Sequence, residues 1–148
     1  MPTAAPPPCT CSRLRRATRA LTQLYDDALA PIGLRVTQLS LLRTLQRNGT
    51  LRIGELAARN LLDRTALSRN LDPLVARKLV AIVPGRDART REVALTRQGE
   101  AALDAAAPHW ERAQREVTKH IGRERLDTLY AVLRDMEAMH PSTLVDAA

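Results

Sequence analysis

Three arginines stand close together in the stretch "PGRDARTREVALT", which runs from Pro84 to Thr96. They are Arg86, Arg89 and Arg91, and the residues around the first two are typical of a turn. Like charges this close repel one another, so a turn without a use for them would be better served by Asp, Asn, Gly or Ser. A guanidinium group pairs well with phosphate oxygens, often through two parallel hydrogen bonds. The stretch therefore indicates a partner that carries many negative charges.

A second group of polar side chains lies upstream, on a segment from about Arg64 to Arg77 with the apolar spacing of a helix. Its predicted buried stripe consists of Leu67, Leu71, Leu74 and Val75. Its opposite face carries Arg64, Thr65, Ser68, Arg69 and Asp72. A polar helix face fits the major groove of DNA, where each base pair shows its own pattern of donors and acceptors. Taken alone, this polar face is also typical of a helix that is simply exposed to solvent. The charged hairpin that follows it favours DNA.

Catalytic and metal-binding patterns are weak by comparison. The three histidines are His109, His120 and His140, and the first two are separated by about three turns of a continuous helix, too far for one metal ion. The sequence contains no glycine-rich phosphate loop and no nucleophile elbow. We therefore expect neither an enzyme nor a metal site, and no cofactor.

Cys9 and Cys11 are the two cysteines, and they form a C-x-C pair near the N-terminus. Two cysteines do not make a disulfide scaffold. They leave open a second hypothesis, in which the protein responds to thiol oxidants or to a thiophilic metal such as arsenite. The alternative is that both thiols lie on a mobile tail without a function of their own.

Composition and charge agree with a compact DNA-binding protein. The 148 residues suffice for one domain, and with 45% hydrophobic residues but no Phe its core must be aliphatic. Of the net charge of +7, much lies in residues 59–97, where nine Lys and Arg face four acids; residues 98–148 hold six against nine. A basic centre predicts a polyanion as partner. A passive architectural DNA protein, which would bind without sequence preference, stays open as a third hypothesis.

No membrane association is expected. No apolar run approaches the ~20 residues that span a bilayer. The first residues, "MPTAAPPPCTC", lack the basic and apolar regions of a signal peptide. We therefore expect a cytoplasmic location.

The elements that position the two polar groups follow from hydrophobic spacing and breaker residues. Helices are predicted from Ser12, as N-cap, to the break at Pro31–Gly33, from near Thr37 to Asn48, over Gly54–Arg59, over Arg64–Arg77, from Arg97 past Leu103, and over Arg123–Met139. The predicted strands are Val80–Val83 and Arg91–Leu95, and Thr96 is the predicted cap of the helix that follows them. Pro73 is expected to bend its helix, and Pro108 to bend or interrupt its own. Helix, turn, helix and hairpin make a winged helix-turn-helix, mainly α with a small β-hairpin wing.

Three stretches resemble the MarR-type transcriptional regulators: "GLRVTQLSLLRTL" (33–45), "ELAARNLLDRTALSRNLDPLVARKLV" (55–80) and "DARTREVALTRQG" (87–99). The resemblance covers nearly the whole chain. It implies that Asp87 braces an arginine of the wing tip and that Arg89 enters the minor groove. The recognition helix would present Arg64, Thr65, Ser68, Arg69 and Asn70. With Arg86 and Arg91, these residues form the predicted DNA-binding set.

One departure from the family pattern concerns Lys78, which stands where these proteins often have glycine. A glycine there would relieve a left-handed backbone at the end of a helix. With Lys78, we expect that turn to be slightly strained or differently shaped.

Apolar stripes at both ends of the chain predict a dimer. The C-terminal stripe and one N-terminal position make up the predicted interface: Leu14, Leu126, Leu129, Tyr130, Leu133 and Met136. A second chain would cover these stripes, although they could also pack within one chain. The resemblance likewise implies obligate dimers on pseudo-palindromic operators, with recognition helices ~34 Å apart. The predicted organisation is a tail (1–11), an N-terminal dimerisation helix (12–35), a DNA-binding lobe (36–97) and C-terminal dimerisation helices (98–148).

The resemblance also implies a small aromatic or phenolic effector that releases the DNA. It places the effector site near the first, second and fifth helices. The candidate residues there are Arg15, Arg19, Tyr25, Arg43, His109 and Trp110. Arginine suits a carboxylate and an apolar wall suits an aromatic ring, although these arginines could equally be surface or interface groups. The expected function is that of a repressor released from its operator by such an acid.

Overall fold

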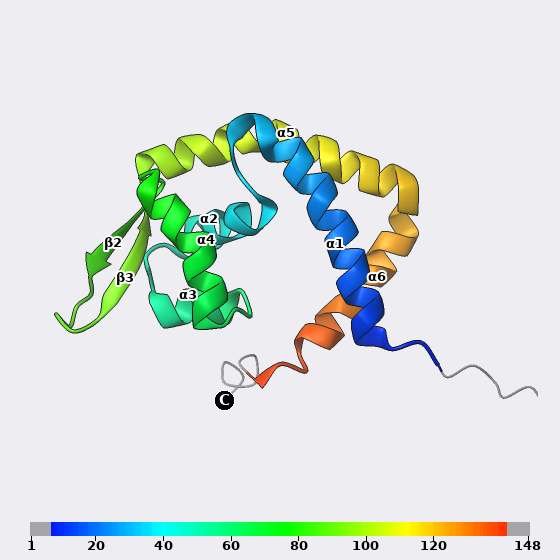
Figure 1. Cartoon of the computed structure of the whole chain (residues 1–148), viewed down its shortest axis with the longest axis horizontal. Coiled ribbons are helices and arrows are strands. Elements are labelled where there is room, and N and C mark those ends of the chain that lie inside the picture. Colours follow the sequence, from blue (N-terminus) through cyan, green and yellow to red (C-terminus); the bar gives the residue numbers. More distant parts are fainter. Residues whose placement is uncertain (1–6, 142–148) are drawn as a thin grey trace, which may run out of the picture.

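The structure is a computed structural model that describes residues 7–141; residues 1–6 of the predicted tail and 142–148 of the predicted C-terminal region lie outside it. In chain order the elements are α1 (Thr10–Leu29), the 3₁₀ helix η1 (Ala30–Ile32), α2 (Val36–Asn48), β1 (Leu51–Arg52), α3 (Ile53–Arg59), α4 (Arg64–Ala76), β2 (Val80–Pro84), β3 (Arg91–Leu95), α5 (Arg97–Ile121) and α6 (Arg123–Glu137). In Figure 1, α2, α3, α4 and the hairpin form a lobe at one end. The long helix α5 arches from that lobe to α6, and α1 packs on it. A mainly α fold with a small β wing is confirmed.

The core of this lobe is aliphatic, as the composition predicts. It is built on fully buried leucines, among them Leu42 and Leu45 of α2, Leu56 of α3 and Leu74 of α4. Three of the four predicted core positions of α4 are buried, whereas Val75 is only half-buried. This core fixes how α4 is rotated, and thereby which of its side chains face outward.

The wing is the predicted hairpin with one strand added. Strands β2 and β3 pair antiparallel from Val80 opposite Leu95 to Pro84 opposite Arg91. The short strand β1 pairs with the other edge of β3, with Leu51 opposite Val93. Strand β1 was not predicted, because two residues are too few to show a strand's alternation.

The junction between the wing and α5 is tightly built. As predicted, Thr96 caps α5: its hydroxyl accepts a hydrogen bond from the Gly99 backbone N–H at 3.0 Å. The same hydroxyl donates to the Lys78 carbonyl at 2.7 Å, before the start of β2. A Cβ atom at position 99 would overlap the Leu79 carbonyl oxygen, so only glycine permits this approach. The base of the wing is therefore anchored to α5.

The turn after α4 confirms the expectation about Lys78. Its backbone is left-handed, with φ of +58°. Side chains with a Cβ atom disfavour this region, whereas glycine adopts it readily. The protein therefore carries backbone strain between its recognition helix and its wing.

Other predicted boundaries are wrong. The first helix begins at Thr10 with Cys9 as N-cap residue, so Ser12 is not its cap and Cys11 lies in its first turn. Helix α5 continues through Pro108 without interruption, and α4 ends at Ala76, one residue before its predicted end at Arg77. None of the helices within residues 7–141 combines the length and the apolar character that crossing a bilayer requires.

Candidate nucleic-acid interface

The recognition helix α4 starts with a side-chain cap. The Asp63 carboxylate accepts a hydrogen bond from the Ala66 backbone N–H at 2.7 Å, which fixes the first turn. Leu67 and Leu71 point into the core. The exposed residues of the first two turns are Arg64, Thr65, Ser68 and Arg69. The polar face predicted from the sequence is therefore free to meet a ligand.

Asn70, the fifth residue that the resemblance places on this helix, has a different environment. Its side-chain oxygen accepts a hydrogen bond from the Thr37 hydroxyl of α2 at 2.7 Å. Its amide nitrogen donates to the Ala66 carbonyl at 2.9 Å. Half-buried and bonded on both sides, Asn70 holds α4 against α2.

The wing tip is shaped by backbone hydrogen bonds around Asp87. The Asp87 carboxylate accepts from the Arg89 backbone N–H at 3.1 Å, and the Asp87 carbonyl accepts from the Thr90 N–H at 2.8 Å. Asp87 thus braces Arg89 through its backbone. Among residues 7–141, the Arg89 guanidinium has no ion pair.

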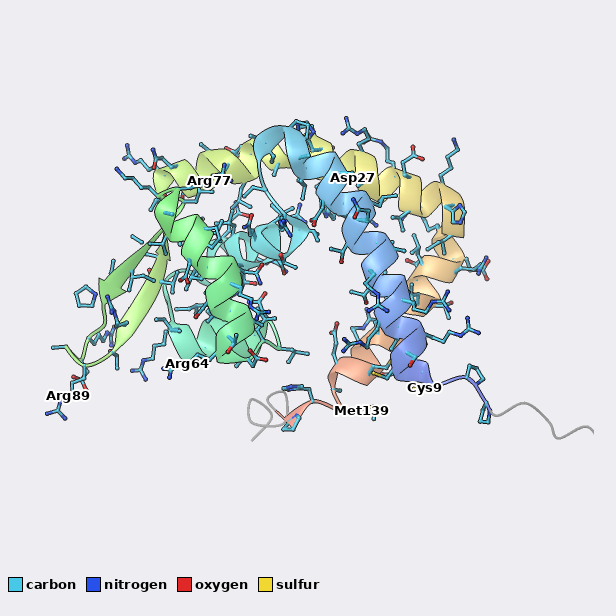
Figure 2. The ribbon with its side chains drawn as sticks, viewed as in Figure 1. Cys9, Asp27, Arg64, Arg77, Arg89 and Met139 are labelled. Carbon is cyan, nitrogen blue, oxygen red and sulfur yellow. The ribbon has the colours of Figure 1, made fainter. Side chains whose placement is uncertain are left out.

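The three wing arginines, Arg86, Arg89 and Arg91, are exposed. Within residues 7–141, no carboxylate lies within ion-pair distance of any of them. Figure 2 shows Arg89 at the wing tip and Arg64 at the first turn of α4, both on the lower side of the lobe. One side of the molecule therefore combines an exposed polar helix face with unpaired guanidinium groups. Protein–DNA interfaces use such groups for contacts to base edges and to phosphates.

Comparison with known proteins agrees with this geometry. The model of the MarR family matches residues 32–90. The Mycobacterium tuberculosis transcriptional regulator MosR, solved in complex with DNA, is 41% identical over 88% of this chain and 98% of that chain, with a TM-score of 0.76. The chain belongs to the MarR family. It is thus a DNA-binding transcriptional regulator with a winged helix-turn-helix, from a family of transcription factors that are generally not enzymes.

Two further MarR-like structures extend the comparison. The transcriptional repressor CouR, bound to a 23-mer DNA duplex, is 26% identical over 86% of this chain and 92% of that chain, with a TM-score of 0.79. BpsR of Bordetella bronchiseptica, whose DNA binding is regulated by 6-hydroxynicotinic acid, is 21% identical over 92% of this chain and all of that chain, with a TM-score of 0.81. At that identity the likeness shows the fold alone. No curated protein sequence matches the chain.

Three of the six predicted effector residues come together between α1, α2 and α5. The Arg43 guanidinium carbon lies 4.1 Å from the centre of the Trp110 ring, a cation–π contact. Partial burial raises the pKa of the Tyr25 hydroxyl, as does Tyr130 to a smaller extent, while nearby Arg43 lowers it. Burial also lowers the pKa of Arg43, and the charge of Arg47 adds to this effect.

Gln114 of α5 links this group to α6, and sequence reasoning missed it. The Tyr25 hydroxyl donates a hydrogen bond to the Gln114 side-chain oxygen. The Gln114 amide donates in turn to the Tyr130 hydroxyl at 3.0 Å. Tyr25 and Gln114 are 89 positions apart, so no local pattern connects them.

In the part of the chain that the structure describes, no hydrogen bond or ion pair links the other three predicted effector residues to this group. Arg15 and Arg19 are exposed on the first half of α1. Nδ1 of His109 is buried and has no hydrogen-bond partner among the residues that the structure describes. A cleft of about 660 Å³ opens beside the group along α5, lined by Trp110, Gln114, three basic side chains, two glutamates and a threonine.

The predicted dimer residues lie on faces that one chain covers only in part. Leu126 is buried, while Leu14, Leu129, Leu133 and Met136 are half-buried. Tyr130, the sixth of them, is exposed (41%), as are other large apolar side chains on the same helices: Leu21 (37%), Leu24 (37%) and Val132 (43%). The described chain thus leaves apolar surface on α1 and α6.

Cys9 and Cys11 are both exposed free thiols at the start of α1. Hydrogen bonds from Ser12, chiefly from its backbone N–H, lower the pKa of the Cys9 thiol. A lowered pKa increases the share of thiolate, which is the reactive form.

Proposed function

We propose that this protein binds a pseudo-palindromic operator as a homodimer. In this mode α4 enters the major groove, where Arg64, Thr65, Ser68 and Arg69 read bases, and Asp87 orients the tip that carries Arg89 into the minor groove. Arg86 and Arg91 contact the backbone beside it. The observation that carries the proposal is the shared side on which Arg64 and Arg89 lie, both without an ion-pair partner among the described residues. Such side chains gain most from phosphates and narrow grooves.

The dimer is supported by the apolar faces of α1 and α6. Exposed apolar patches on a folded chain commonly mark interaction sites. A second copy would bury Leu133 and its neighbours, and two-fold symmetry would present two recognition helices to two half-sites. We propose the organisation that the sequence suggests, with a DNA-binding lobe over 36–97 and dimerisation helices over 12–35 and 98–148, except that α1 extends the first of these helices back to Thr10.

This binding mode can be tested with a duplex selected from a random library by the wild-type protein. Fluorescence anisotropy should show at least 100-fold tighter binding to that duplex than to a shuffled sequence. Sedimentation should find two chains per duplex. Equal affinity for both duplexes would instead favour an architectural DNA protein. A single bound chain would contradict the dimer.

For the effector, we propose that a small aromatic acid binds beside Arg43 and Trp110 and releases the operator. The cleft along α5 has the volume of a small-molecule site and offers an aromatic wall with basic side chains. An aromatic acid, 6-hydroxynicotinic acid, regulates DNA binding in BpsR, which has the same fold. Such a ligand must bind the DNA-incompetent arrangement more tightly than the competent one. The protein would then be a repressor, because its release from the operator would allow transcription of the genes beside it.

The effector proposal is tested by screening benzoate, salicylate, hydroxybenzoates and nicotinates for compounds that both raise the melting temperature and release the selected duplex. The variants Arg43→Gln and Trp110→Ala should need at least tenfold more of an active compound. Arg97→Gln is the matched control, because it removes a positive charge from the exposed start of α5, away from Arg43 and Trp110. A compound that acts equally on all variants would place the effector elsewhere.

A second candidate function is favoured by the lowered pKa of the exposed Cys9 thiol. In this case a hydroperoxide oxidises Cys9 and Cys11 to a disulfide. The two thiols give up two electrons and two protons, and the peroxide is reduced to an alcohol and water. Release of DNA by a peroxide or by arsenite that disappears in Cys9→Ser/Cys11→Ser, with no active aromatic acid, would support this function over the first.

A further inference from the structure

Arg77 connects the far end of the recognition helix to the turn between α1 and α2. It is the C-cap residue of α4. Its Nη1 donates a hydrogen bond to the Gly33 carbonyl at 2.5 Å, and its Nη2 donates to the Ile32 carbonyl at 3.2 Å. Both arms of one guanidinium group thus hold two consecutive carbonyls of a segment more than 40 positions away. We name this contact the clasp.

The turn that receives the clasp is itself fixed. Gly33 has a left-handed φ of +65°, and its N–H donates to the Ala30 carbonyl at 3.0 Å. A Cβ atom at position 33 would lie 3.6 Å from Nη1 of Arg77 and in a backbone region that disfavours side chains. On the other side, the Asp26 carboxylate of α1 accepts from the Val36 N–H, at the start of α2, at 2.7 Å. The clasp therefore joins α4 to a turn that is tied to α1.

The position of the clasp gives it leverage over DNA binding. Arg77 and Arg64 lie at opposite ends of α4 (Figure 2). Thirteen helical residues span about 20 Å, so a rotation of about 10° at Arg77 moves the DNA-reading end by about 3.5 Å. That is about the rise of one base pair, since ten base pairs span about 34 Å. Small changes at the clasp would therefore change which bases each lobe can reach.

We propose that Arg77 is a positioning residue that fixes each recognition helix relative to the dimerisation helices, and thereby sets the half-site spacing that the protein accepts. This proposal rests on the proposed binding of a dimer to two half-sites. Arg77 itself does not touch the bases, because it lies at the end of α4 away from Arg64. Arg77 affects how the two lobes are placed relative to each other. The affinity for a duplex with a single half-site does not depend on that placement.

The proposal is tested with variants of the selected duplex in which the two half-sites are moved apart or together by one and two base pairs. Wild-type protein should prefer one spacing by at least tenfold. Arg77→Gln removes the charge and the fork and should reduce this preference to less than threefold, while affinity for a single half-site stays within twofold of wild type. Arg77→Lys, with one donor group in place of the fork, should restore part of the preference. Gly33→Ala, which disturbs the turn from the other side, should reduce it as well.

Two controls separate positioning from stability and charge. Arg47→Gln removes one positive charge from α2 without touching the clasp, and it should keep the wild-type spacing preference. In the free dimer, spin labels at Ala88→Cys in a Cys9→Ser/Cys11→Ser background should give a broader wing-to-wing distance distribution once Arg77→Gln is added. This second measurement needs no DNA, so it also applies to a variant whose operator affinity is reduced.

Three results would overturn the proposal in different ways. If wild-type protein has no spacing preference, the two-half-site mode fails, and the clasp proposal fails with it. If wild-type protein has a preference that Arg77→Gln fully retains, with an unchanged distance distribution, only the clasp proposal fails. If Arg47→Gln reduces the spacing preference as much as Arg77→Gln does, the effect comes from the lost charge, and a role of the clasp is refuted.

Discussion

Replacement of Arg89 by alanine should weaken operator binding without changing the fold or the dimer. The hydrogen bond that shapes the wing tip runs from the Arg89 backbone N–H to Asp87, and alanine keeps that N–H. The side chain is exposed and has no ion pair among residues 7–141, so its removal costs little packing. The variant should therefore unfold at the same temperature as the wild type.

The size of the binding defect follows from counterion release. Each phosphate charge neutralised contributes about 0.9 to the slope of log affinity against log salt. A dimer has two wings, so Arg89→Ala should flatten that slope by about 1.8. With equal affinities of variant and wild type at about 1 M salt as the reference, Arg89→Ala binds about 60-fold more weakly than the wild type at about 0.1 M salt. At about 0.3 M salt the difference shrinks to about ninefold. A defect confined to one wing would flatten the slope by only about 0.9.

An anisotropy titration over this salt range measures both quantities. Arg69→Ala is the informative comparison: if Arg69 reads a guanine edge, its loss should relax specificity at one base position by ~1–3 kcal/mol. Arg89→Ala should instead weaken binding most on A·T-rich flanks, where the minor groove is narrow. If Arg89→Ala keeps the wild-type slope and binds every flank as the wild type does, Arg89 does not contact DNA and this reasoning is wrong.

Four further substitutions test the fold and the interface. Lys78→Gly should stabilise the protein by about 0.5–1 kcal/mol in denaturant unfolding, because relief of the left-handed backbone outweighs the added freedom of the unfolded chain; a lower midpoint would contradict this. Asp63→Ala removes the cap of α4 and should destabilise the protein by about 1 kcal/mol, whereas an unchanged midpoint would deny the cap a role. Leu133→Asp, like Leu129→Asp, should place an unpaired charge in the proposed interface and yield monomer or aggregate that no longer binds the operator. Sedimentation of an intact dimer in both variants would refute the assigned interface.

The elements that form the DNA-binding side were predictable because their signals are local. Helical spacing fixes the buried face of α4, and the turn residues between Val83 and Arg91 fix the wing. The family resemblance also pointed to the strained turn at Lys78, which the structure confirms. The expected roles of the individual DNA-binding residues remain predictions.

The features that sequence reasoning missed depend on contacts between distant segments. Strand β1 exists only because Leu51 and Arg52 pair with β3, and two residues are too few to predict that pairing. Gln114 meets Tyr25 across 89 positions. In the sequence, Arg77 looks like an ordinary arginine at a helix end. Only the structure shows that its side chain bonds to the turn at Gly33. In each case the partner is chosen by tertiary packing, which local periodicity does not encode.

The proposed binding mode is tested most directly by hydroxyl-radical footprinting of the wild-type protein on the selected duplex. A dimer with two recognition helices and two wings should protect two symmetry-related blocks centred about one helical turn, ~34 Å, apart, with outer protections where the wings enter the minor groove. Arg89→Ala should lose the outer protections and keep the inner ones. One asymmetric block, or uniform protection without two-fold symmetry, would contradict the proposed binding mode.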